Sequence, residues 1–161
     1  MRKTGVIGAL LFLWLVGQAK AQEPLSTAFI SAVQANNPAL LKEWYPTPAL
    51  VRLLEPERTK KLSDAAIKRT FLVPLQKKLA KDFENFQASA QKSSVDLREL
   101  QYLNFQLQRD ESSTANKPIA CTITYSYGDK QGAFTVTVLE KQGKWYLFEI
   151  LLSVNVFDKL N

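Results

Sequence analysis

The segment Pro118–Leu152, PIACTITYSYGDKQGAFTVTVLEKQGKWYLFEILL, decides the fold of this chain. Three runs in it are rich in β-branched and aromatic residues and predict the strands Ile119–Tyr127, Ala133–Glu140 and Lys144–Leu152. The two gaps between these runs contain glycine, whose conformational freedom suits a chain reversal. We therefore expect three consecutive antiparallel strands.

The two turns predict which side chains share a face of the sheet. We place the first turn at Asp129-Lys130 and expect a three-residue second loop, Lys141–Gly143. Because side chains alternate along a strand, this register puts the strongest apolar residues on the face that helices would cover. This inner face is expected to carry Ile119, Cys121, Ile123, Tyr125, Tyr127, Phe134, Val136, Val138, Tyr146, Phe148, Ile150 and Leu152.

The opposite face is expected to expose a semi-apolar patch. Exposed patches of this kind usually mark a contact with another protein or subunit. We therefore expect self-association into a homodimer through the outer sheet face; the alternative is that the C-terminal tail or the first helix covers this face. The candidate interface residues are Leu139, Trp145, Leu147 and Leu151.

The residues before this segment complete the fold. Leu100–Arg109 alternates between apolar and polar residues and predicts a fourth strand, with Leu103, Phe105 and Leu107 on one side. Helical patterns precede it, so the sequence predicts an α+β fold. Its N-terminal helices would pack on one face of a curved four-stranded antiparallel β-meander.

The longest helical pattern begins after Ser63 and carries an apolar stripe at intervals of three and four residues. Pro74 lies inside this pattern, and its ring removes a backbone donor and crowds the carbonyl of Thr70. We expect a kink there, or two helices that meet at Val73.

Residues 1–21 have the features of an export signal. Arg2 and Lys3 precede an apolar run, and Ala19-Lys20-Ala21 has the small-x-small pattern of a cleavage site. The apolar run is shorter than the roughly 20 residues of a membrane span, although a retained N-terminal anchor is the alternative. We expect an exported protein, periplasmic or secreted, with no stable membrane span after cleavage. Its single domain would comprise residues 22–161.

Composition limits the chemistry of the chain. The formal charge of +6 falls to about +3 without the signal, whose three cations have no acidic counterpart, so we expect no nucleic-acid partner. The sequence contains no histidine, which excludes Ser-His-Asp and Cys-His arrangements. Cys121 is the only cysteine, so neither a zinc site nor an internal disulfide is expected. We expect no metal and no cofactor.

The closing hairpin, Gly143-Lys144-Trp145-Tyr146-Leu147, and the early helix followed by Asn36-Asn37 and Tyr45 carry a family resemblance. In these features the chain resembles the NTF2-like superfamily, the SnoaL/cystatin-like α+β cone. The resemblance implies a pocket between the long helix and the inner sheet face, and commonly a dimer. Members include isomerases, dehydratases and non-catalytic binding domains, so the fold alone assigns no activity.

The implied pocket would be lined mainly by aromatic side chains. The candidates are Phe71, Leu75, Phe83, Tyr125, Tyr127, Tyr146 and Phe148. We favour a non-catalytic domain that binds a small apolar ligand or a protein partner, because the register places no carboxylate inside. The alternative is a small isomerase- or dehydratase-type enzyme that uses pocket tyrosines and a carboxylate. A separate alternative is an anion-binding face formed by the cations between Arg58 and Lys81.

Overall fold

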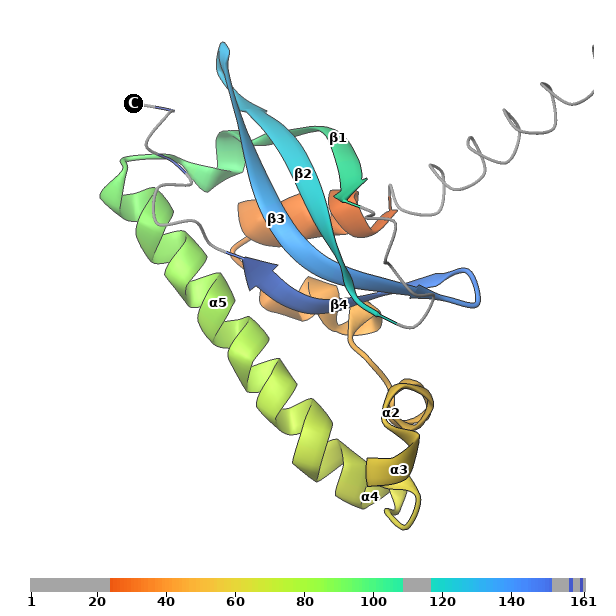
Figure 1. Ribbon diagram of the computed structural model, residues 1–161. Coiled ribbons are helices and arrows are strands. Elements are labelled where there is room, and N and C mark those ends of the chain that lie inside the picture. Colours follow the sequence, from red (N-terminus) through yellow and green to blue (C-terminus); the bar gives the residue numbers. More distant parts are fainter. Residues whose placement is uncertain (1–23, 109–116, 152–156, 158–159, 161) are drawn as a thin grey trace, which may run out of the picture.

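The structure is a computed structural model that describes residues 24–108, 117–151, 157 and 160 (Figure 1). Helices come first and a four-stranded antiparallel sheet follows, so the predicted α+β fold is confirmed. The sheet is open and its strand order is β1-β2-β3-β4, a simple meander. The export signal expected at residues 1–21 lies outside the described residues.

The strands lie close to the predicted ranges, and each one pairs with the next along the chain. Their bounds are Gln101–Gln108 for β1, Ile119–Tyr127 for β2, Lys130–Lys141 for β3 and Lys144–Leu151 for β4.

The helices are mostly short, and α5 is the exception. A first helix covers residues 24–34. It is followed by the 3₁₀ helix η1 (Pro38–Trp44), α2 (Pro48–Leu54), α3 (Pro56–Thr59), α4 (Asp64–Ile67), the π-helix η2 (Lys68–Leu72), α5 (Val73–Lys92) and the 3₁₀ turn η3 (Leu97–Glu99).

Side-chain caps explain where several of these helices begin. The Thr47 hydroxyl accepts a hydrogen bond from the Leu50 N–H, and the Ser63 hydroxyl accepts one from the Ala66 N–H. Pro48 follows Thr47 at the first helical position, where its missing N–H costs nothing. Thr47 and Pro48 together therefore fix the start of α2.

A π-helical turn accommodates Pro74. In η2 the Val73 N–H donates to the Lys68 carbonyl, five residues back instead of four. This wider turn directly precedes the proline, whose ring would otherwise crowd the carbonyl of Thr70. The helical run from Asp64 to Lys92 is thus interrupted where the sequence predicted.

The first hairpin turns one position earlier than predicted. The turn residues are Gly128 and Asp129, so Ile123 pairs with Phe134 and not with Val136. Gly128 has φ +60°, which suits the first position of a two-residue hairpin turn. Each residue of β2 therefore pairs with a β3 residue two positions earlier than predicted. A shift of two keeps every side chain of β2 and β3 on its predicted face.

The second hairpin corrects the predicted faces of β4. Its loop has two residues, Gln142 and Gly143, both with positive φ (53° and 73°), as a type I′ turn requires. Lys141 therefore pairs with Lys144, and the start of β4 is inverted relative to the prediction. Trp145 (2% exposed) and Leu147 (0% exposed) point into the core, whereas Tyr146 is half-buried opposite Leu139.

A bulge in β4 then restores the predicted orientation of its second half. Val138 pairs with Leu147, but Thr137 pairs with Glu149, which leaves Phe148 as the extra residue. Ile150 is buried opposite Val136, on the inner face as expected.

The predicted exposure of the outer patch was wrong. Leu139, Trp145 and Leu147 are all buried, and of the four candidate interface residues only Leu151 is substantially exposed (39%). The two-residue turn explains the burial of Trp145 and Leu147, because a loop one residue shorter than predicted exchanges the two faces of β4.

A second bulge changes β1. Tyr102 pairs with Tyr125, and the next pair joins Asn104 to Thr124, so Leu103 is the extra residue. Leu103 is 42% exposed and does not share one side of the strand with Phe105 and Leu107, as the alternation predicted. Tyr102 packs against the core in its place.

Aromatic rings fill the space between the sheet and the helices. Tyr125 stacks on Phe134 with ring centroids 4.2 Å apart, and Phe86 of α5 meets Phe134 at 4.5 Å and Phe157 at 5.1 Å. Gly132, opposite Tyr125, leaves room for the tyrosine ring, since a Cβ there would lie 2.4 Å from the ring carbon Cζ. The core is therefore packed with rings.

A second, smaller hydrophobic cluster lies among the short helices. Val51, Ile67 and Leu72 are buried together there, with Leu62 and Phe71 at its margin. No helix in the described part of the chain is long and apolar enough to cross a membrane.

The register of β4 can be tested by two neighbouring substitutions. Trp145→Ala should lower the free energy of unfolding by about 3–5 kcal/mol, because it empties a fully buried site. Tyr146→Ala should cost only about 1 kcal/mol, since this side chain is half-buried. Chemical denaturation of both variants measures the two losses in free energy of unfolding. A larger loss for Tyr146→Ala than for Trp145→Ala would contradict the observed register and favour the three-residue turn.

Candidate functional site

The aromatic residues expected to line one pocket do not come together. Phe83 and Tyr125 are buried in the main core, and Leu75 packs at its edge. Phe71 belongs to the margin of the second cluster, with the Arg58 guanidinium 5.1 Å from its ring centroid.

The other three candidates lie on separate parts of the sheet. The Tyr127 hydroxyl accepts a hydrogen bond from the Asp96 N–H at 3.3 Å. Tyr146 has the Lys144 ammonium 5.4 Å from its ring centroid, and Phe148 occupies the bulge of β4. The seven residues therefore do not form a common ligand pocket.

The reactive groups on the inner sheet face are unsuited to acid–base chemistry. Burial raises the pKa of the Tyr125 phenol and raises that of the Cys121 thiol to about 11, so both stay protonated at neutral pH. Glu149 is paired with Lys78 at 2.7 Å, outside the core. Among the described residues, no three His, Cys, Asp or Glu side chains lie close enough together to hold a metal ion.

The cations between Arg58 and Lys81 are partly neutralised by neighbouring acids. Arg58 pairs with Glu55 at 3.5 Å, and Lys81 pairs with Glu84 at 3.4 Å. Lys78 contacts both Asp82 and Glu149. These pairs reduce the charge that the expected anion-binding face would present.

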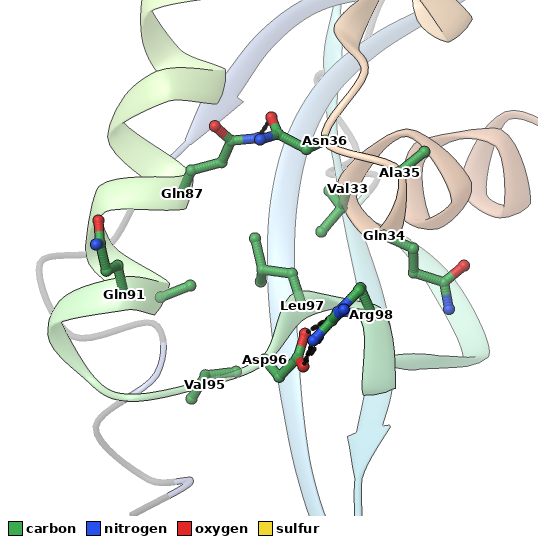
Figure 2. Close-up of a pocket in the computed structure, with 11 residues that line it drawn as sticks. Val33, Gln34, Ala35, Asn36, Gln87, Gln91, Val95, Asp96, Leu97 and Arg98 are labelled. Carbon is green, nitrogen blue, oxygen red and sulfur yellow. Dashed lines mark hydrogen bonds and ion pairs between the residues drawn. The ribbon is translucent and has the colours of Figure 1, made fainter.

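A pocket of about 470 Å³ lies where the first helix, α5 and the η3 turn meet (Figure 2). This volume is within the range typical of ligand sites. We call it the helix-end pocket. Its lining residues are Val33, Gln34, Ala35, Asn36, Gln87, Ala90, Gln91, Val95, Asp96, Leu97 and Arg98.

The first helix brings Asn36 to the pocket by ending in a Schellman motif. Asn36 has φ +52°, a left-handed conformation that asparagine tolerates well. The Asn37 N–H donates to the Ala32 carbonyl, and the Asn36 N–H donates to the Val33 carbonyl. The helix therefore ends abruptly and places the Asn36 side chain beside the pocket.

The long helix α5 ends in the same way. Ser94 has φ +53°, and the Val95 N–H donates to the Ala90 carbonyl while the Ser94 N–H donates to the Gln91 carbonyl. Two helix C-termini thus lie beside one pocket, and the chain leaving α5 delivers Asp96 to it.

Carboxamide side chains line the pocket between these helix ends. The Gln87 amide donates to the Asn36 carboxamide oxygen and links α5 to the end of the first helix (Figure 2). The Gln34 amide donates to the Leu100 carbonyl, which joins the first helix to the start of β1. Gln91 is exposed at the pocket rim.

Asp96 and Arg98 form the one charged pair of the helix-end pocket. The Arg98 Nε and Nη2 atoms donate to the Asp96 carboxylate at 2.9 Å and 2.6 Å, and the Arg98 N–H donates to the same group at 3.0 Å. These hydrogen bonds lower the pKa of Asp96 from 3.8 to about 2. Asp96 is therefore an anion at neutral pH, so it cannot act as a general acid there, and its low pKa makes it a weak base.

A second hollow of about 360 Å³ lies between η1 and α5. It is lined by Pro38, Ala39, Lys42, Tyr45, Gln76 and Ala80. Burial raises the pKa of Tyr45, so this phenol also stays protonated at neutral pH.

The sequence interpretation did not identify the helix-end pocket. In the sequence, Asn36 is only part of the early segment that carries the family resemblance, Gln87 lies within the long helical pattern, and Asp96 and Arg98 belong to a stretch without a distinctive pattern. The available signal was the two helix ends at Asn36-Asn37 and Ser93-Ser94, which gives no indication that they meet in space.

Comparisons with protein-family models, with curated proteins and with solved structures find no match to this chain. The resemblance to the NTF2-like superfamily therefore stays a prediction from the sequence.

The Asp96–Arg98 pair predicts a specific titration. Arg98→Met should raise the pKa of Asp96 from about 2 towards 3.8, because the guanidinium donors are lost. The folded-state pKa lies below the unfolded one, so the pair stabilises the fold above about pH 4 and loses this effect as the pH falls towards 2.

The titration is followed by NMR of the Asp96 carboxyl carbon. Arg58→Met is the matched control, since it removes an arginine elsewhere and should leave the pKa near 2. An unchanged pKa in Arg98→Met would contradict the assigned contact.

Proposed function

We propose that this chain is an exported, non-catalytic binding domain that recognises a protein partner through the helix-end pocket. The chemistry of that pocket carries the proposal. It combines side-chain carboxamides and one guanidinium over a floor that includes Val33 and Val95, and it offers no group that exchanges a proton near neutral pH.

Carboxamides suit the recognition of a polypeptide backbone. Each side-chain amide carries two N–H donors and an acceptor oxygen, which complement the C=O and N–H of a peptide bond. Gln34 and Gln87 each use one N–H in the hydrogen bonds described above. The exposed Gln91 and the largely exposed Arg98 add donors at the rim.

A small apolar ligand, the other expectation from the sequence, has less support. Its implied site between α5 and the inner sheet face holds the rings of Tyr125, Phe134 and Phe86 in mutual contact. Five apolar and six polar side chains line the helix-end pocket, so it is not the predominantly apolar site that such a ligand favours.

The isomerase- or dehydratase-type alternative also has less support. It needs a tyrosine and a carboxylate that face one substrate. The buried Tyr125 lies against Phe134, and Asp96 is held by Arg98 at the helix-end pocket. Tyr125 is buried and the pKa of Asp96 is lowered to about 2, so neither group suits such catalysis.

Membership of the NTF2-like superfamily remains part of this proposal. The order of helices followed by an antiparallel meander supports it. A homodimer across the outer sheet face has little support, since three of its four expected residues are buried.

The binding function is tested by site-directed photo-crosslinking in the cells from which the gene comes. A photoreactive residue at Gln91, on the pocket rim, should trap one discrete protein. The same residue at Lys60, exposed in the turn after α3, should not. Arg98→Ala should reduce the yield from position 91 several-fold.

Two outcomes would contradict the proposed partner class. One is the absence of any protein adduct from position 91 in the folded chain. The other is a bound small molecule, detected by native mass spectrometry, that is lost in Arg98→Ala.

Export is tested separately by mass spectrometry. The full chain should yield a mature protein that begins at Gln22 and is released from the periplasm or into the medium, because Ala19-Lys20-Ala21 suits signal peptidase. Ala21→Leu should block cleavage. An uncleaved wild-type chain that remains membrane-bound would favour the retained anchor.

A further inference from the structure

We propose that β1 pairs with β1 of a second copy of this chain, forming a two-fold dimer with one continuous sheet. The two open edges of the sheet are β1 and β4. The paired surface would be the free edge of Asn104–Gln108, and its centre would be Gln106. This surface is separate from the helix-end pocket and from the outer sheet face.

The two sheet edges are in different situations. The helix α5 packs against β4, and its Lys78 forms an ion pair with Glu149 at 2.7 Å. Within the described residues, β1 has one strand partner, β2. Every second residue of such an edge directs its N–H and C=O away from the sheet, where they are ready to pair with another strand.

The side chains of β1 do not protect this edge. Natural edge strands usually carry charges, proline or bulges that oppose pairing with another chain. All eight residues of Gln101–Gln108 are uncharged and none is proline. The one protective device is the bulge at Leu103, which leaves the five residues after it as a regular run.

The regular run is complementary to itself. In an antiparallel pair centred on Gln106, that residue faces its own copy and Asn104 faces Gln108, so exposed amides of the outer face lie opposite one another. Phe105 faces Leu107, so the two inner-face residues that pack against the core also lie together. No like charges are opposed anywhere in this register.

The bulge selects this register over its neighbours. A pair centred on Phe105 would bring the bulged Leu103 opposite Leu107 and place Tyr102 opposite Gln108, on the wrong face. A pair centred on Leu107 would align fewer residues of the run. The Gln106 register matches both faces over the whole run and forms roughly four to six backbone hydrogen bonds.

Sedimentation equilibrium on protein purified from cells expressing the full chain tests the pairing. The wild type should show a concentration-dependent mass that reaches a dimer. Gln106→Lys should weaken the dimer by about tenfold or more, because it opposes two ammonium groups on the two-fold axis. Gln101→Lys is the matched control, as it adds the same charge to an exposed residue on the other side of the bulge, and it should leave the dimer intact.

A charge-complementation arm keeps the test specific. Mixing Gln106→Lys with Gln106→Glu should restore a dimer, now between unlike chains. A wild type that stays monomeric at all concentrations would overturn the proposal, as would a Gln106→Lys variant that dimerises as tightly as the wild type.

Cysteine crosslinking distinguishes the edge from the outer face. In a Cys121→Ala background, Gln106→Cys should oxidise to a disulfide-linked dimer, whereas Thr135→Cys, in the middle of the outer face of β3, should not. Crosslinking at Thr135 without crosslinking at Gln106 would assign the dimer to the outer face and overturn the edge pairing.

Discussion

The ring of Phe134 is the contact on which the described structure depends. Its ring centroid lies 4.2 Å from that of Tyr125 in β2, on which it stacks, and 4.5 Å from that of Phe86 in α5. The centroids of Phe29, in the first helix, and of Phe157 lie 5.8 Å and 6.1 Å away. One side chain of β3 thus contacts a neighbouring strand, two helices and a residue near the C-terminus. Edge-to-face and stacked contacts of this kind add to the burial of each ring. Because these rings fill the interior, binding sites must be sought at its periphery.

The two peripheral surfaces that we propose as binding sites are close along the chain. The η3 turn contributes Leu97 and Arg98 to the helix-end pocket, and β1 begins two residues later. Leu100 lies between η3 and β1, and its carbonyl accepts a hydrogen bond from the Gln34 side-chain amide. This bond links the end of the first helix to the start of the edge strand. A partner bound in the pocket would therefore contact the segment that positions β1. Pocket occupancy and strand pairing would be coupled to the extent that this segment moves on binding.

Most of the fold could be predicted from the sequence, because each strand has a β-forming composition or a clean alternation and the helices are marked by apolar periodicity and, in several cases, by a capping residue. The faces of β4 could not, since Lys141-Gln142-Gly143 is compatible with a two-residue or a three-residue loop. Both choices give a favourable turn, and packing alone decides that Trp145 and not Tyr146 enters the core. The bulges at Leu103 and Phe148 are likewise not predicted by the alternation of apolar and polar residues along the strands. The helix-end pocket escaped prediction because helix ends distant in sequence meet there only after folding.

The bulge at Leu103 also determines how far the proposed assembly can grow. An edge strand that pairs along its full length can recruit further strands in several registers, which leads to open aggregates. Here the bulge restricts pairing to Asn104–Gln108, and a two-fold pair uses the same run on both copies. An interface formed by the same surface on both copies is complete with two chains and leaves no site for a third. The remaining edge at β4 is flanked by α5, so the uncharged β1 edge is compatible with a dimer of defined size.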